Sequence, residues 1–251
     1  MLSYWCTALL SGTVSEMTGS RTARQRARAE LTQEIKDRAR EQLAEVGADG
    51  LSLRAVAREL GMVSSALYRY FPSRDQLLTA LIIDAYNALG DTAEAAVKQE
   101  DTHRGQWLAL CHGVRGWAKH NPHEYALIYG SPIPGYQAPQ DTVAPASRVA
   151  VAFVGILARA EAEHGLRPPL TAPELTPVLD DQLRRLAADL APQLPPAAVG
   201  RAIFAWTQLF GMISFELFGQ LVGSVDPADE FFAHSVDQLA EFVGLRPPRG
   251  A

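Results

Sequence analysis

The side chains best suited to bind another molecule are concentrated between Leu51 and Leu78. This run reads LSLRAVARELGMVSSALYRYFPSRDQLL and supplies serine hydroxyls, arginine guanidinium groups and tyrosine phenols. Groups of these kinds contact the phosphates and base edges of DNA. Their spacing is typical of two short helices joined by a tight turn, the helix-turn-helix pattern, which places its second helix in the major groove. The chemistry that this run indicates first is therefore DNA binding.

Local signals define the two helices. Ser52 is a good N-cap for the first helix, because its hydroxyl accepts a hydrogen bond from a free backbone N–H. Gly61 ends that helix, since glycine adopts the left-handed conformation without steric cost. Ser64 is expected to cap the second helix, and Pro72 ends it by restricting the residue before it. The apolar residues at helical spacing predict one shared core: Leu53, Val56, Ala57, Leu60, Leu67 and Phe71.

The same run resembles the DNA-binding domain of the tetracycline-repressor (TetR) family of bacterial transcription regulators. The resemblance rests on Ser52, Ala57, Leu60-Gly61, Leu67-Tyr68, Tyr70-Phe71 and Pro72-Ser73-Arg74 before Leu77. It departs from the family at Ser65-Ala66, where a hydroxyl that often reaches a phosphate is missing. The resemblance implies an all-α protein with an N-terminal three-helix helix-turn-helix domain. A C-terminal helical bundle for ligand binding and dimerisation would follow.

The resemblance also assigns roles to individual residues of this chain. Arg54 is the best candidate for reading a base, because its guanidinium pairs with guanine O6 and N7. Ser64 and Ser65, at the start of the recognition helix expected over Ser64–Tyr70, are the next candidates. Phosphate contacts, which set position rather than sequence, are expected from Ser52, Tyr68, Tyr70 and Arg74. For the two tyrosines, packing against the protein is the alternative.

The charge distribution allows an acidic protein to bind DNA. The formal net charge of the 251 residues is −5. Residues 1–80 hold 11 Lys and Arg against 9 Asp and Glu, whereas the remainder holds 12 against 19. A local basic arm serves phosphate binding even when the whole chain is acidic. Arginines gather before and within the first helix, at Arg21, Arg24, Arg26, Arg28, Arg38 and Arg40.

No motif for catalysis, a cofactor or a metal is found. Cys111, His112, His120 and His123 match no established ligand spacing, so surface histidines and a core cysteine are the simpler interpretation. The sequence lacks a nucleophile elbow, a glycine-rich phosphate loop and paired carboxylates in an apolar setting. Two cysteines in a chain of this size favour a reduced, cytoplasmic setting. The protein is therefore not expected to be an enzyme.

Helical periodicity continues through the rest of the chain. Three parts are expected: an N-terminal extension over 1–20 without ordered structure, a DNA-binding domain over 21–82, and a regulatory and dimerisation domain over 83–251. Translation starting at Met1 and at Met17 both fit the sequence. Helices are expected over 23–46, 73–99, 106–121, 122–129, 147–164, 174–190, 197–222 and 227–243. The stretch His112–Tyr136 also resembles a C-terminal domain type found in a branch of the TetR family, with Trp117, His120-Asn121-Pro122 and Pro132-Ile133-Pro134-Gly135-Tyr136.

Several bulky side chains of the second half are candidates to line a ligand pocket. Plain core packing is the alternative for each of them, because the two roles look the same in a sequence. Few charges lie on the inward faces, so the ligand is expected to be small and largely apolar. The candidates are Trp107, Cys111, Trp117, Tyr125, Phe153, Trp206 and Phe210.

The stretch Ala202–Val222 is apolar nearly all round, as expected of a helix covered from several directions. Its length would also span a bilayer, but Glu216 near its middle costs roughly 2.5–3.5 kcal/mol there. Packing against a second copy is the favoured interpretation, and an internal core helix and a membrane span are the alternatives. No membrane partner is expected. The interface candidates are Phe215, Phe218, Phe231 and Leu239.

Together these features predict a homodimeric, ligand-responsive repressor that binds a pseudo-palindromic operator in double-stranded DNA. A helical ligand-binding or enzymatic protein with a purely structural helix-turn-helix is the alternative. The resemblance implies that ligand in the bundle displaces the helix after the recognition helix, so that the two reading heads no longer match the operator. The sequence leaves the operator, the effector and the sign of regulation open.

Overall fold

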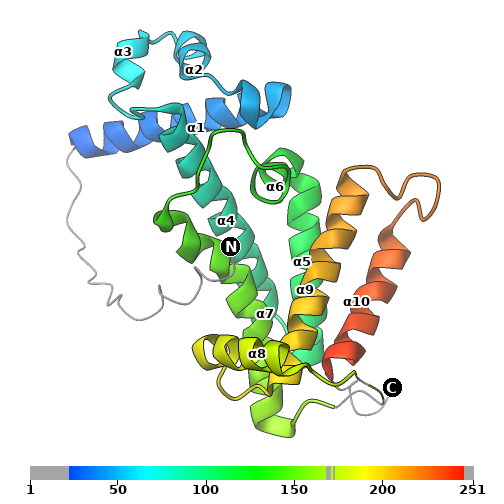
Figure 1. Ribbon diagram of the computed structural model, residues 1–251. Helices are drawn as coiled ribbons and strands as arrows, with labels where there is room; N and C mark the ends of the chain where they lie inside the picture. The colour runs from blue at the N-terminus through cyan, green and yellow to red at the C-terminus, as the bar shows by residue number, and fades with distance from the viewer. Residues whose placement is uncertain (1–22, 168–170, 172, 246–251) are drawn as a thin grey trace. The chain divides into compact units, whose positions relative to one another are not determined.

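The computed structural model of the protein describes residues 23–167, 171 and 173–245, and every regular element in these ranges is a helix (Figure 1). The chain divides into two compact units. Described residues 23–86 and 121–145 form the N-terminal unit, and 87–120 with the described residues from 146 on form the bundle unit. The α-helices are α1 (Ala23–Gly50), α2 (Leu53–Glu59), α3 (Ser64–Leu67), α4 (Arg74–Lys98), α5 (His103–His120), α6 (Pro122–Tyr129), α7 (Val143–His164), α8 (Pro177–Leu190), α9 (Pro196–Leu217) and α10 (Asp229–Val243), with the 3-10 turn η2 at Gln140–Thr142.

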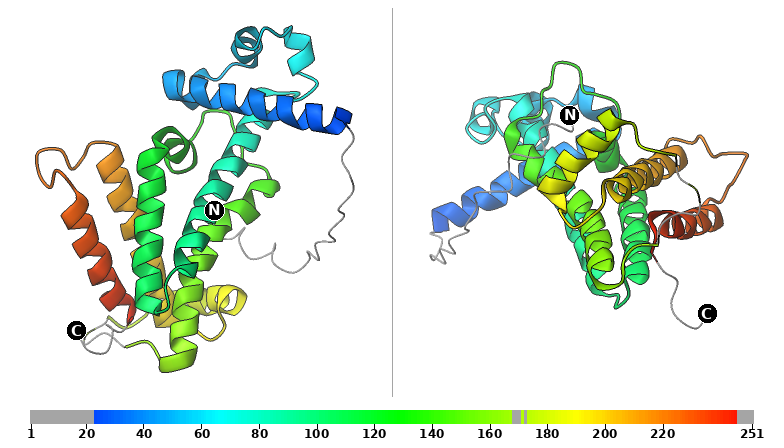
Figure 2. Two further views of the ribbon diagram at one scale, coloured as in Figure 1. Left: turned by 180° about the vertical axis from the view of Figure 1, so that it is seen from behind. Right: turned by 60° about the horizontal axis from the view of Figure 1, so that its bottom comes forward.

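The N-terminal unit is built around α1. Helices α2 and α3 lie on one side of α1 and α6 lies on the other (Figures 1 and 2). The apolar positions expected to share a core do so, and they pack with the first part of α4 and with Leu127 of α6. The fully buried members include Ile35, Val56, Ala57, Leu67, Leu77 and Leu78.

Polar contacts bind α6 and the loop after it to this unit. Arg40 on α1 donates to Asp84 of α4 at 2.6 Å and to Glu124 of α6 at 2.9 Å. The hydroxyls of Thr79 and Tyr136 lie 2.9 Å apart, which fixes the loop to α4. This grouping differs from the expected division at residues 82 and 83, which remains a prediction. The expectation for residues 1–20 lies outside the described residues.

In the bundle unit, α9 packs against α5, α8 and α10, and α10 also packs against α5. Figure 1 shows α5, α9 and α10 side by side. Trp107 lies at the centre of this core, where its indole nitrogen donates to the carbonyl of Val236 at 3.0 Å. Satisfying the buried N–H in this way removes the cost of an unpaired donor. The fully buried side chains around it include Leu110, Val114, Phe153, Ile156 and Phe232.

Several helix ends differ from the expected ones. The N-cap of α3 is Val63 rather than Ser64, and α3 ends at Leu67 rather than at Tyr70, with turns in between. Helix α9 ends at Leu217, five residues before the expected end at Val222. Glycine is the reason for the earlier end, because Gly219 has φ 81° and stops the helix. Gly61, with φ 65°, ends α2 as expected.

By length and composition, one stretch among the described residues, Gln140–His164, is apolar enough to cross a membrane. A core helix passes the same test, and α7 buries Val149, Phe153, Ile156 and Leu157 inside the bundle unit. The α9 stretch, for which a membrane span was one alternative, does not meet the same criterion. Its Glu216 is paired with Arg115 of α5.

Candidate nucleic-acid interface and ligand cavity

The helix-turn-helix is held in place from α1. The side-chain oxygen of buried Gln42 accepts a hydrogen bond from the backbone N–H of Ser52 at 2.7 Å. The Ser52 hydroxyl in turn accepts from the N–H of Ala55 at 3.4 Å, as an N-cap does. Leu67 of α3 is fully buried, so α3 is fixed by its inner face and presents the other face outward. Gln42 was missed in the sequence, where a polar residue between apolar helix positions was its only signal.

The exposed face of α2 and α3 carries the predicted base-reading residues. Arg54 and Ser65 are exposed, and Tyr68 is 40% exposed. Ser52 and Ser64 are half-buried. The 70% exposed Val63 lies directly before α3, and an apolar side chain there is suited to the methyl group of thymine. Val63 could not be singled out in the sequence, because only the fold shows that it faces outward.

Tyr70 faces inward in part. Its ring packs against the core of the N-terminal unit, and the Arg28 guanidinium lies 5.3 Å from the ring centre. Arg28 also donates to the backbone carbonyl of Arg69 at 3.4 Å. These contacts connect the start of α1 to the turn that follows α3. The packing alternative for Tyr70 therefore has structural support, while phosphate contact by Tyr70 stays a prediction.

Arg74 is engaged with the protein's own backbone. Its guanidinium donates to the carbonyls of Ala48 at 2.6 Å, Leu51 at 3.2 Å and Asp49 at 3.3 Å. These carbonyls belong to the segment between Gly47 and the start of α2. The geometry assigns Arg74 to holding α4 against this segment, a role that was not expected from the sequence. Its predicted phosphate contact is not tested by this geometry.

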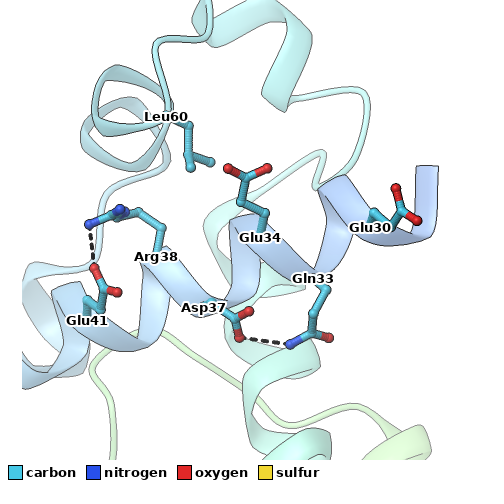
Figure 3. Close-up of a pocket in the computed structure, with 7 residues that line it drawn as sticks. All are labelled: Glu30, Gln33, Glu34, Asp37, Arg38, Glu41 and Leu60. Carbon is cyan, nitrogen blue, oxygen red and sulfur yellow. Dashed lines mark hydrogen bonds and ion pairs between the residues drawn. The ribbon is translucent and has the colours of Figure 1, made fainter. Parts of the chain in front are cut away.

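One face of the N-terminal unit is unsuited to phosphate. A surface pocket of about 370 Å³ lies between α1 and Leu60 and is lined by acidic side chains of α1 (Figure 3). Gln33 donates to Asp37 at 2.8 Å, and Arg38 pairs with Glu41, so the one arginine of the pocket is already neutralised. Asp37 pairs with Arg40. Glu30 and Glu34 form no ion pair within the described part of the chain, and their charges would repel a phosphate backbone. The lining residues are Glu30, Gln33, Glu34, Asp37, Arg38, Glu41 and Leu60.

The bundle unit contains an apolar cavity of about 110 Å³ between α7, α8 and α9. Of the predicted pocket residues, Phe153 and Trp206 line it. Trp107 packs against Phe153 with tilted rings whose centres are 4.3 Å apart, and Phe210 packs in the same way against Trp206 at 4.5 Å, both behind the cavity wall. Cys111 and Trp117 are buried but line no part of this cavity, and Tyr125 belongs to the N-terminal unit.

The outer faces of α9 and α10 expose a row of aromatic side chains. Phe215 is 55% exposed, Phe218 45% and Phe231 39%. Leu239 is 9% exposed and packs inside the chain, so it supports α10 rather than facing outward. Phe204 and Phe242 extend the same surface at 49% and 39% exposure, with ring centres 5.0 Å apart.

Behind this surface, a charged cluster joins α5, α9 and α10. The buried Arg115 donates two hydrogen bonds of 2.6 Å to the carboxylate of Glu216 and one of 2.9 Å to Asp229. Lys119 lies 3.0 Å from Glu216. Burial by itself raises the pKa of Glu216, but hydrogen bonds from Arg115 and Lys119 lower it below the ordinary value. In the sequence, Glu216 stands out as a carboxylate within an apolar helix. The sequence did not identify Arg115 as its partner.

Within the described ranges, no group of three or more His, Cys, Asp or Glu side chains is arranged to hold a metal ion. The ring of His112 lies 5.4 Å from that of Phe232, and desolvation together with Arg115 lowers the pKa of His112. Burial raises the pKa of the Cys111 thiol, which therefore stays protonated and unreactive at neutral pH.

Comparison with known proteins agrees with the helix-turn-helix and the helical bundle. Residues 35–81 match the family model for bacterial regulatory proteins of the tetR family, and residues 107–239 match the tetracyclin repressor-like C-terminal domain. The HTH-type transcriptional regulator Rv1816 of Mycobacterium tuberculosis is 42% identical over 202 residues, covering 78% of this chain and 85% of its own. The regulator Mb1846 of Mycobacterium bovis matches to the same extent.

Solved structures give the same result. The crystal structure of the regulatory protein SCO4313 superposes with a TM-score of 0.73 at 35% identity, covering 88% of this chain and all of that one. A protein of unknown function from Rhodococcus sp. RHA1 superposes with a TM-score of 0.65 at 25% identity, over 92% of this chain and all of that one.

The fold and its helix-turn-helix thus define a DNA-binding transcription regulator rather than an enzyme. The chain belongs to the TetR family. Its all-α architecture, a helix-turn-helix domain followed by a helical domain, confirms the expected fold class. The narrower resemblance of His112–Tyr136 to one branch of the family stays a prediction.

Proposed function

We propose that the protein is a homodimeric repressor that leaves its operator when a small apolar effector binds to the bundle unit. The observation that carries the dimer is the aromatic surface of α9 and α10. Monomeric proteins rarely expose a large contiguous apolar patch, and such patches mark interaction sites. The aromatic surface of α9 and α10 consists of Phe204, Phe215, Phe218, Phe231 and Phe242. A second copy of the chain is the partner that a TetR-family regulator offers for this surface.

A two-fold dimer would present two copies of α3 to DNA. The operator is then pseudo-palindromic, with half-site centres about 34–36 Å or a multiple of that apart. Arg54 reads a base in this proposal, with Ser64 and Ser65 beside it, while Ser52 and Tyr68 contact phosphates. The acidic pocket of α1 faces away from DNA, because its carboxylates would oppose phosphate contact.

Effector control is typical of the family, and the apolar cavity of the bundle unit supports the proposal of an effector site there. A ligand shifts the regulator between DNA-bound and free forms only through its differential affinity for the two. Because the proposed regulator binds chromosomal DNA, it is expected in the cytoplasm, where that DNA lies.

Gel-shift titration of purified protein on DNA from upstream of its own gene tests the proposal. The shifted complex should contain two chains per duplex, resist competition by unrelated DNA, and weaken steeply as salt rises. A complex with one chain per duplex would contradict the dimer. A shift that unrelated DNA removes equally well would contradict operator recognition.

A further inference from the structure

The cavity between α7, α8 and α9 is made by small side chains. Four of its twelve lining residues are alanines, from α7, α8, the segment after α8, and α9. Protein interiors are normally filled to crystal-like density. The space exists here because the sequence has alanine at four positions where larger side chains would fill it. The lining residues are Ala150, Phe153, Val154, Leu186, Ala187, Leu190, Ala191, Leu194, Val199, Ala202, Ile203 and Trp206.

The lining decides the chemistry of an occupant. None of these residues carries a charge, a hydroxyl or an amide side chain, and the indole nitrogen of Trp206 is the one polar side-chain atom among them. A polar group placed in this cavity would lose its hydrogen bonds to water without replacing them. An apolar group would gain from burial and from contact with the rings of Phe153 and Trp206. The cavity therefore selects for hydrocarbon.

The volume of the cavity restricts the class of ligand further. At about 110 Å³ the cavity is smaller than the roughly 300–1,000 Å³ of a pocket for a drug-sized molecule. In size it is closer to an engineered apolar cavity of about 150 Å³ that binds benzene or xenon. Unlike that enclosed cavity, this one is partly open to solvent. A single aromatic ring or a short branched alkyl group fits this scale. A larger effector would place only such a group inside.

The cavity and the aromatic surface share one helix. Val199, Ala202 and Trp206 follow one another at three- and four-residue spacing and face the cavity from α9. Phe204 and Phe215 leave α9 on another face, since successive residues point about 100° apart. Trp206 also makes an edge-to-face contact with Phe153 of α7, with ring centres 5.7 Å apart. A ligand that moves these side chains presses on the helix that carries the exposed phenylalanines.

We propose that this cavity binds a small hydrocarbon group, a single ring or a short branched alkyl chain, and that occupancy shifts α9 and so alters the surface presented to the second copy. The coupling to the second copy rests on the proposed dimeric repressor. The binding of a hydrocarbon group in the cavity does not depend on it. In this scheme the effector acts through the geometry of the dimer.

Benzene is the probe, and its binding to the full-length protein is measured by calorimetry without DNA. Wild-type protein should bind benzene, and phenol, of nearly the same shape, should bind about tenfold more weakly because the lining side chains offer its hydroxyl proton no acceptor. The variant Ala187→Leu fills the cavity and should lose benzene binding. Ala188→Leu makes the same change on the exposed side of α8 and should bind like the wild type. Absence of binding to wild type, or equal binding to both variants, overturns the site.

Xenon pressurisation of wild-type crystals tests the same site without a substitution. Xenon density between α7, α8 and α9 supports it, and xenon density confined to other places overturns it. The coupling is read separately, as the dimer dissociation constant with and without benzene. A change of at least about threefold supports the coupling, and an unchanged constant overturns it. If the protein proves monomeric, the proposed function fails while the benzene and xenon results still decide the site.

Discussion

The substitution Arg74→Ala distinguishes two possible roles of Arg74: holding the N-terminal unit together and contacting DNA. In the structure the guanidinium of Arg74 reaches the carbonyls of Ala48 and Leu51 in part-buried surroundings and that of Asp49 at the surface. A hydrogen bond to a charged group contributes about 1.5–3 kcal/mol, and neighbouring bonds from one side chain do not add fully. Counting the two part-buried bonds, the substitution should lower the free energy of unfolding by about 2–4 kcal/mol.

Urea unfolding followed by circular dichroism measures this change. Because the chain has two compact units, the transition of the N-terminal unit is best isolated with hydrogen exchange at the backbone amides of α2 and the first part of α4. Arg74→Lys keeps the charge but replaces the planar fork by a single ammonium, so it should recover only part of the loss. Arg58→Ala removes an exposed arginine from α2 and is the matched control, with an expected change within about 0.5 kcal/mol.

The opposite outcome has a clear signature. If Arg74 binds phosphate instead, Arg74→Ala leaves the urea midpoint unchanged and reduces the salt dependence of DNA binding by about one phosphate contact. Arg74→Lys would then retain most of the DNA affinity. That combination would refute the structural role of Arg74.

Three further substitutions test other parts of the molecule. Arg54→Ala should cost about 1–3 kcal/mol in operator binding and relax specificity at one base pair, which a competition titration with single-base operator variants measures. Phe215→Asp should give monomers in light-scattering chromatography, whereas Val178→Asp, at another exposed apolar site on α8, should leave the dimer intact. The lowered pKa of Glu216 means that its contribution to stability is complete above the pKa of an unfolded glutamate, about 4.3, and is lost as the pH falls through the folded value. Glu216→Gln should therefore lower the melting temperature at pH 7 and make it less sensitive to acid, and an unchanged melting temperature at pH 7 would contradict a stabilising role for this carboxylate.

The elements of the N-terminal unit were predictable because their signals are local. Gly61 ends α2 through its own backbone conformation, and Leu67 is buried because helical spacing puts it with Phe71 on the core face. The end of α9 was predicted too late, since apolar periodicity continued through Val222 while Gly219 stopped the helix. The tendency of Gly219 to adopt a left-handed backbone conformation outweighed the apolar helical periodicity of the residues around it.

The site was less predictable, because its geometry depends on residues far apart in the sequence. Arg74 looked like a surface arginine until the fold brought the carbonyls of Ala48 and Leu51 to its guanidinium. The cavity requires Ala150, Ala187 and Ala202 to meet across three helices, and no local signal marks that meeting. Leu239 shows the converse: helical spacing put it on the apolar face of α10, and only packing showed that this side faces inward.

Hydroxyl-radical footprinting on the DNA upstream of the gene is the most direct test, because it reports DNA recognition and two-fold symmetry together. A dimeric regulator should give two protected patches related by a pseudo-two-fold axis, with centres one helical turn of about 10–10.5 base pairs or a multiple of it apart. A single protected half-site, or uniform weak protection that unrelated DNA abolishes, would contradict a dimer that presents two recognition helices.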